Sequence, residues 1–304
     1  MKRTYESKRH HWWPSAVSGY WADARGMVTQ VLDDGKDVTG APWTFGHDKH
    51  THNIRFGGPW NSSFESMYGK ADNSAGTIID WLSTLDARRA NFSGGFSERM
   101  LAQPIIRERR GLLAEVLASL IVRSPLMRHR IARGVESARD AFPSLDIIAD
   151  TSIVAANMRP LLAAFTRRML VTGKFAVLLS EDRELIFGDG FFSTFPTNGH
   201  VSGFHRCIIP MTPSMAVLYT SPFRYVSNCE LATIVLRKDE VDFLNLLVQV
   251  YSRDRIFYRS NRPVIHEAFL ARQHMQLPGH SDPELDCLFA AVAEFANRPL
   301  ATSV

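Results

Sequence analysis

Three histidines and a carboxylate fall within six residues of the chain, in the stretch His47-Asp48-Lys49-His50-Thr51-His52. Imidazole and carboxylate groups are common ligands of zinc and other divalent metals. On a strand, His50 and His52 would share a face, and on a helix His47 and His50 would be neighbours. The stretch therefore predicts a divalent-metal site made by His47, His50 and His52. An exposed polar loop is the alternative interpretation, because the further ligands of a binuclear hydrolase are not evident.

A second candidate is the histidine pair His10-His11, which precedes Trp12-Trp13-Pro14. An imidazole beside bulky aromatic rings can have a shifted pKa and act as an acid or a base. The alternative is a packed imidazole that hydrogen-bonds to the backbone. His11 is therefore a candidate catalytic residue.

A third candidate is Asp189 in the tripeptide Gly188-Asp189-Gly190, which directly follows an apolar run. A carboxylate at a strand end, flanked by glycines, is a common place for a metal-binding or catalytic acid. Aspartate and glycine also favour ordinary turns, so a turn is the alternative.

Basic residues gather in four places, which are Arg88-Arg89, Arg107 to Arg110, Arg123 to Arg133, and Arg167-Arg168. Such runs can form a stripe that faces phosphates, so nucleic acid is the predicted partner. Solvated helix faces are the alternative explanation. The sequence contains no P-loop, no GxSxG elbow and no HExxH motif, so the enzyme classes that depend on these motifs are not indicated.

The elements that must position these residues predict an α+β fold in one domain, residues 1–304. Residues 1–74 form an aromatic-rich arm, 75–173 a helical region and 174–304 a β-rich region with flanking helices. The arm holds five of the six tryptophans, and an irregular segment this aromatic needs a partner surface. We therefore predict that Trp12 and Trp13 are buried against the C-terminal β region.

Hydrophobic periodicity and turn residues predict the individual elements. In the arm and the middle we expect an edge strand at 27–32 and a helix that begins at about 72–74, with Asp72, Asn73 or Ser74 as its N-cap, and ends at Gly94-Gly95. Further helices are expected at 97–122, kinked or restarted at Pro104, at 128–141, and at 145–172, the last interrupted at Pro160. After Gly173 we expect a hairpin of 175–179 with 185–187, strands at 207–209 and 215–219, a helix at 239–250, a strand at 255–258 and a final helix whose N-cap is Ser281.

The bulk composition is that of an ordinary globular chain. Apolar residues make up 45% of the 304 residues, and the formal net charge of +4 does not by itself argue for a polyanion. The three cysteines are widely spaced, which excludes a zinc knuckle and indicates reduced thiols. The charged N-terminus and the lack of a long apolar stretch predict a cytoplasmic protein with no membrane contact.

Several short motifs, in order along the chain, resemble a bacterial family catalogued as domain of unknown function 4238. The element His11-Trp12-Trp13-Pro14 resembles the opening His-x-x-Pro of that family. The segment around Asp189 resembles its Ser-Asp-Asn-Pro position, although only the aspartate is kept. Pro210-Met211-Thr212-Pro213 resembles its Pro-Leu-Thr-Pro strand entry, and Asn245 lies in a helix that is followed by a strand, as in the family.

The resemblance implies a bacterial or phage-related intracellular origin and a site shared by His11, Asp189 and Asn245. Three hypotheses follow from it. In the first hypothesis the protein is a hydrolase, and more specifically a nuclease that uses a divalent metal. In the second it is a non-catalytic binding or sensing module. In the third His11 and Asp189 only pair in a buried turn. The sequence does not indicate the oligomeric state.

Overall fold

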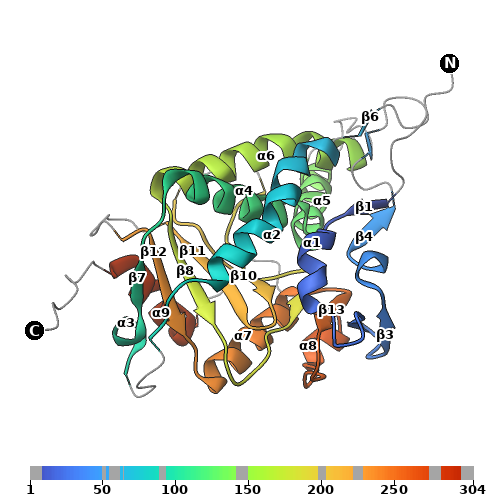
Figure 1. Ribbon diagram of the computed structural model, residues 1–304. Coiled ribbons are helices and arrows are strands. Elements are labelled where there is room, and N and C mark those ends of the chain that lie inside the picture. Colours follow the sequence, from blue (N-terminus) through green and yellow to red (C-terminus); the bar gives the residue numbers. More distant parts are fainter. Residues whose placement is uncertain are drawn as a thin grey trace, which may run out of the picture.

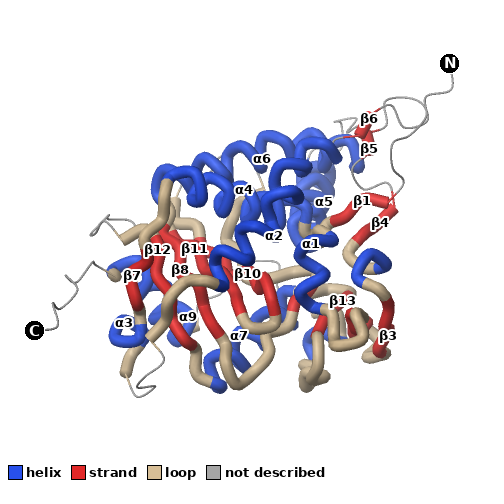
Figure 2. Tube along the Cα trace, in the orientation of Figure 1, coloured by secondary structure: helices blue, strands red, loops and turns tan. Residues whose placement is uncertain are grey.

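The computed structural model describes residues 9–49, 53–54, 62–63, 65–88, 94–141, 150–197, 203–221, 229–273 and 282–295. These residues form a mixed α+β fold, as predicted, with 48% helix and 21% strand. Figure 2 shows the central strands between an upper and a lower group of helices. In the part of the chain that is described, no helix is both long enough and apolar enough to cross a membrane.

The larger sheet has five strands in the order β10-β11-β8-β12-β7. Their bounds are Arg206–Thr212 (β10), Met215–Thr220 (β11), Lys174–Leu179 (β8), Leu231–Val235 (β12) and Leu101–Gln103 (β7). Strands β8 and β12 are parallel, and the other pairs are antiparallel. Every residue of β11 and β12 is buried, which means that both faces of the sheet are covered.

The upper helices in Figure 1 come from the middle of the chain, as the apolar spacing predicted. They are α2 (Gly69–Ser83), α4 (Arg107–Arg123), α5 (Pro125–Ala141) and α6 (Asp150–Thr172). Three details of the prediction are wrong. The helix predicted to reach residue 94 ends at Ser83, where the hydroxyl groups of Ser83 and Thr84 donate to carbonyl groups of its last turns. Helix α6 runs through Pro160 without a break, because one lost backbone hydrogen bond is offset by the packing of α6 along α4. Residues 101–103 form β7 rather than helix, since Gln103 precedes Pro104 and proline disfavours helix in the residue before it.

The lower group contains α3 (Phe96–Arg99), α7 (Lys238–Tyr251), α8 (Glu267–Leu270) and α9 (Pro283–Glu294). Helix α7 and strands β10 and β11 confirm their predictions, and the two strands pair with each other as a hairpin. The predicted N-cap of the last helix is wrong. Asp282 caps α9, because its carboxylate accepts hydrogen bonds from the backbone N–H groups of Glu284 and Leu285. Ser281 itself lies outside the described residues.

A second sheet joins the N-terminal arm to the C-terminal part of the chain in the order β3-β2-β13-β9. Its strands are Asp37–Gly40 (β3), Val28–Leu32 (β2), Arg255–Tyr258 (β13) and Phe187–Gly188 (β9). Two predictions are corrected here. Strand β2 is an interior strand rather than an edge, because β13 pairs with its free side. The run at 185–187 is not a hairpin partner of β8, because β9 pairs with β13 in this sheet.

The rest of the arm consists of short elements. They are β1 (Arg9–His11), α1 (Ser15–Ser18), η1 (Gly19–Trp21), η2 (Pro42–Thr44), β4 (His47–Lys49), β5 (Asn53–Ile54), β6 (Ser62–Ser63) and η3 (Glu65–Tyr68). Strand β1 pairs with β4, and β5 pairs with β6. The tryptophans after β1 are buried, as predicted. Trp13 is fully buried, and its ring lies 4.7 Å from that of Phe187 and 4.5 Å from that of Phe257.

Replacing Trp13 with alanine should lower the free energy of unfolding by about 3–5 kcal/mol, because it empties a buried site between Phe187 and Phe257. Urea unfolding followed by circular dichroism measures the change. Trp43 is the matched control, since 65% of it is exposed, and its replacement with alanine should change the stability by no more than about 0.5 kcal/mol. Equal effects of the two substitutions would contradict this account of the arm.

Candidate functional site

Asp189 lies just after β9 and is almost completely buried. Its carboxylate accepts hydrogen bonds from the backbone N–H groups of Arg253 (2.8 Å) and Asp254 (2.9 Å), in the turn that follows α7. The flanking glycines permit this contact. A Cβ at Gly188 would come within 1.9 Å of Ser252 Oγ, and a Cβ at Gly190 within 1.9 Å of the Tyr251 carbonyl oxygen. The Gly-Asp-Gly tripeptide thus closes β9 against the end of α7.

Burial raises the pKa of Asp189 to about 7, although the two backbone N–H groups favour the charged form and partly oppose the effect. A carboxylate that takes both of its hydrogen bonds from backbone groups is placed to hold a turn. Its contacts therefore resemble those of a structural residue rather than those of a metal ligand.

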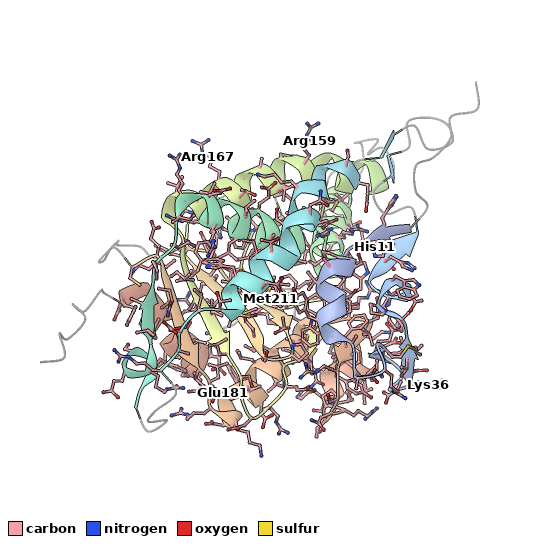
Figure 3. All side chains as sticks on the ribbon, viewed as in Figure 1. His11, Lys36, Arg159, Arg167, Glu181 and Met211 are labelled. Carbon is pink, nitrogen blue, oxygen red and sulfur yellow. The ribbon has the colours of Figure 1, made fainter. Side chains whose placement is uncertain are left out.

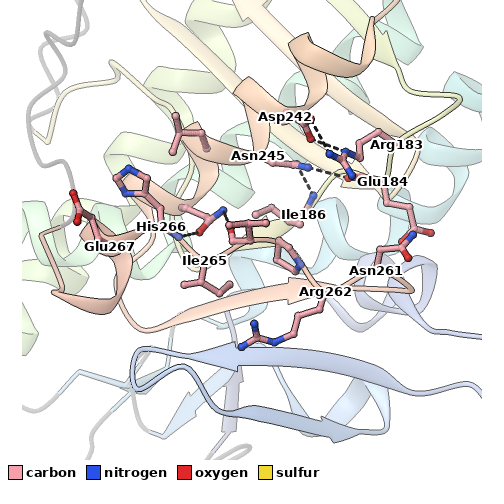
Figure 4. Close-up of a pocket in the computed structure, with 14 residues that line it drawn as sticks. Arg183, Glu184, Ile186, Asp242, Asn245, Asn261, Arg262, Ile265, His266 and Glu267 are labelled. Carbon is pink, nitrogen blue, oxygen red and sulfur yellow. Dashed lines mark hydrogen bonds and ion pairs between the residues drawn. The ribbon is translucent and has the colours of Figure 1, made fainter.

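Asn245 lies on α7 and clamps an extended segment that precedes β9. Its side-chain oxygen accepts a hydrogen bond from the backbone N–H of Ile186, and its amide nitrogen donates to the carbonyl of Glu184, both at 2.9 Å. Figure 4 shows the side chain pointing at this segment, in the wall of a pocket of about 600 Å³. Both ends of the Asn245 amide are therefore used to hold backbone.

His11 is half-buried on β1 (Figure 3), where its ring meets that of His47 edge to face at 5.5 Å. Burial lowers the pKa of His11, and the neighbouring His47 lowers it further. Of the predicted metal ligands only His47 can be placed, since His50 and His52 lie outside the described residues. Among the residues that the structure describes, no group of three His, Cys, Asp or Glu side chains could hold a metal ion.

The described hydrogen bonds and ring contacts do not join His11, Asp189 and Asn245 to one another. Asp189 takes its side-chain bonds from the turn after α7, and Asn245 makes its own with the segment before β9. The bonds of Asp189 also differ from the predicted pairing of Asp189 with His11, because both carboxylate oxygens meet backbone N–H groups instead. Only His11 has ionisable side chains as its main neighbours.

Those neighbours come from five elements. We call the group the His11 cluster, and it comprises His11 (β1), His47 (β4), Glu65 and Tyr68 (η3), Asp72 (α2), Arg123 (α4) and Arg128 (α5). Its members are linked by charge, since Glu65 and Asp72 raise the pKa of His11 while Arg123 lowers it. The cluster forms where the N-terminal arm lies against the upper helices (Figures 1 and 3).

Arg123 is the most buried charge of the cluster, with 1% of its side chain exposed. One guanidinium nitrogen donates to Asp72 at 2.5 Å, and the group also lies 5.0 Å from the centre of the Tyr68 ring. The carbonyl oxygen of His11 accepts a weaker bond of 3.5 Å from the same guanidinium. Arg123 therefore ties β1 to α2 and α4, because an unpaired charge at this depth would be strongly destabilising.

Glu65 and Arg128 are the other two charged residues of the cluster, and burial shifts the pKa of both. Burial raises the pKa of Glu65, although His10 and Arg123 partly oppose the effect. Burial also lowers the pKa of Arg128 from a very high ordinary value. The Nε and Nη2 atoms of Arg128 are buried and have no hydrogen-bond partner among the described residues. These two nitrogens are donors with the geometry that suits an anionic oxygen.

Sequence reasoning did not identify Glu65, Asp72, Arg123 or Arg128 as site residues. The sequence predicts a basic stripe that includes Arg123 and Arg128. This prediction is wrong for Arg123, whose side chain is buried. One signal was available, because Arg123 directly follows the most apolar run of the chain, 112–122, and an arginine there has an apolar environment on its own helix. The sequence predicts Asp72 as a candidate N-cap, whereas α2 begins earlier, at Gly69, and Asp72 lies in its first turn.

Other arginines of the predicted stripe are also held by internal contacts. Arg110 pairs with Glu230, Arg168 donates to the carbonyl of Gly203 at 2.6 Å, and Arg130 donates to the carbonyl of Ser193. Arg109 lies over the Trp81 ring. A large part of the basic sequence runs therefore supports the fold directly rather than forming a free cationic surface.

The buried carboxyl of Asp189 should make the protein less stable as the pH rises from about 4 to about 7. Its pKa is raised in the folded state, so the folded protein binds more protons in this window than the unfolded chain, and stability falls as the pH rises. In the variant Asp189→Asn this contribution is absent. We expect the difference in melting temperature between pH 5 and pH 8 to be smaller in the variant than in the wild type. The same pH dependence in both proteins would refute the assignment.

No family model, no curated protein and no solved structure matches the chain in the comparisons with known proteins. The resemblance to domain of unknown function 4238 therefore stays a prediction that depends on the short motifs around His11, Asp189, Pro210 and Asn245.

Proposed function

We propose that the protein is a hydrolase of phosphoester bonds, with His11 as general base and Arg128 as a holder of the anionic substrate. The observation that carries this proposal is the composition of the His11 cluster. It combines an imidazole, a carboxyl group and a guanidinium that has two buried nitrogens without a described partner. Acid, base and anion holder are the groups that hydrolysis of a phosphoester requires.

In this proposal each residue has a distinct role. His11 is neutral near pH 7, since its pKa is lowered, so it can accept a proton from the attacking water. The water oxygen forms a bond to phosphorus while the bond from phosphorus to the leaving oxygen breaks. Glu65, whose pKa is raised, gives its proton to that leaving oxygen. Arg128 donates hydrogen bonds to a non-bridging oxygen of the phosphate.

Asp189 and Asn245 have no catalytic role in this proposal, because their side-chain hydrogen bonds hold backbone segments. A nuclease activity on DNA or RNA, and the use of a divalent metal, are the finer parts of the proposal. The alternative is a module that binds an anionic ligand without cleaving it. This alternative is favoured by Asp189 and Asn245, two of the three predicted site residues, because their side chains bond to backbone groups.

The activity is tested on bis(p-nitrophenyl) phosphate and on single- and double-stranded DNA and RNA oligonucleotides, each with EDTA, Mg²⁺ or Mn²⁺. His11→Gln and Glu65→Gln should each lower kcat by about 10²–10⁴-fold, the range for loss of a general acid or base. Arg128→Lys should retain more activity than Arg128→Ala, since it keeps the charge. Arg133→Ala is the control on the same helix, because Arg133 is exposed and pairs with the exposed Glu136.

Melting curves show whether each variant is folded. If the folded wild type cleaves nothing in the panel but binds the oligonucleotides, the binding-module alternative replaces the hydrolase. If it neither cleaves nor binds, both proposals for the His11 cluster fail.

The pH dependence of kcat/KM tests the role of His11 separately. The rate should fall at acid pH along a limb that lies below pH 6.5, because the pKa of His11 is lowered from that ordinary value. The variant His47→Gln removes one of the causes that lower it, so the acid limb should move to higher pH. His266→Gln is the control, since His266 caps α8 in another part of the fold. An acid limb that stays in place in His47→Gln would exclude His11 as the titrating base.

A further inference from the structure

A groove of about 1010 Å³ runs along one face of α6, apart from the His11 cluster. The residues that α6 contributes recur at helical spacing, from Arg159 through Ala163 and Arg167 to Val171. At a rise of about 1.5 Å per residue this face is about 18 Å long. The opposite wall comes from the start of α4 and from the start of α2.

The floor of the groove is apolar. It includes Leu162 and Leu170 from α6, Ile105 from the segment before α4, and Met67 from η3. Val171 lies at one end with 68% of its surface exposed, and Ile106 beside the groove is 60% exposed. A hydrophobic surface of this kind along a helix is typical of a site that receives another protein element.

The rim of the groove carries an excess of positive charge. Its two acidic residues are already neutralised, because Glu115 pairs with Lys70 and Glu230 pairs with Arg110. The remaining cations are Arg107, Arg159 and Arg167, and none of them forms an ion pair with a residue that the structure describes. Figure 3 shows Arg159 and Arg167 projecting outward from the upper side of the molecule.

We propose that this groove binds an acidic amphipathic helix of a partner protein. The apolar floor can pack against the apolar face of such a helix, and the guanidinium groups of Arg107, Arg159 and Arg167 can pair with acidic side chains on its flanks. The length of the groove matches about three turns of the partner helix. Nucleic acid fits less well, because the described lining contains no aromatic side chain on which a base would stack. The inference is independent of the hydrolase proposal, since it uses none of the residues of the His11 cluster.

The test uses the full chain and a fluorescein-labelled 18-residue peptide with leucines on one helical face and glutamates on the other. Two matched probes are a scrambled peptide of the same composition and a peptide with lysines in place of the glutamates. Fluorescence anisotropy should show binding of the acidic amphipathic peptide at least about tenfold tighter than of either matched probe, a difference that reflects both the apolar face and the charge.

Substitutions separate the two parts of the groove. Val171→Asp should weaken binding of the acidic peptide by about tenfold or more, because it places a charge on the apolar surface of the groove. The double variant R159E/R167E should weaken it by a similar factor, because it replaces the positive charge of the rim with negative charge. The controls are Val264→Asp, on a valine that is 92% exposed in another part of the fold, and Arg25→Glu, on an exposed turn. Neither control should change the affinity.

The proposal is overturned if the acidic peptide binds no better than the scrambled one, or if both groove variants bind it as the wild type does. It is also overturned if a 12-nucleotide single strand, rather than the peptide, loses affinity in R159E/R167E. Melting curves of the groove variants should match the wild type, because all three substituted side chains are exposed.

Discussion

The aromatic stack formed by Trp12 and Trp13 with Phe187 and Phe257 is the interaction on which the arrangement of the arm depends. These four rings come from the N-terminus, from β9 and from β13, so their burial brings together parts of the chain that are far apart in sequence. Close packing of large rings is also directional, because offset and edge-to-face geometries are favoured. The stack therefore fixes both the position and the orientation of the chain that leads into it.

His11 directly precedes this stack, and its place in the fold follows from the same packing. With Trp12 and Trp13 anchored on the second sheet, β1 lies beside Arg123 and pairs with β4, which brings the ring of His47 to that of His11. The charges of Glu65 and Asp72 then act on the imidazole from η3 and α2. A cluster of ionisable groups thus forms at the boundary between the arm and the helices, where burial is partial. Partial burial shifts the pKa values of such groups.

Three buried polar groups outside the cluster form their hydrogen bonds with backbone groups. Asp189 holds the turn after α7, Asn245 holds the segment before β9, and Lys174 donates to the carbonyl of Ala293 at the end of α9. Each of these contacts joins segments that are far apart in the sequence. Such groups are stabilising only while their partners stay in place, because a buried polar atom without a partner is destabilising by about 1–3 kcal/mol.

The α+β character and the positions of several main elements followed from the sequence alone. The spacing of apolar residues predicted α4 and α7, and the apolar runs around Pro210 to Pro213 predicted strands β10 and β11. The aromatic density of the arm predicted the burial of Trp12 and Trp13. These features are local or depend on hydrophobicity, which a single sequence expresses directly.

Tertiary structure alone decided which strands pair and what the polar residues do. The run at 185–187 has the same local pattern whether it pairs with β8 or with β13, and only packing against Trp13 and Asn245 distinguishes the two. Asp189 reads equally well as a catalytic acid or as a turn residue, because its two N–H donors lie more than sixty residues away in the chain. Arg123 has the residue type of a surface cation, yet the partner that permits its burial, Asp72, comes from a different helix. Partners so distant in sequence leave no periodic signal, and for this reason the His11 cluster emerged only from the folded chain.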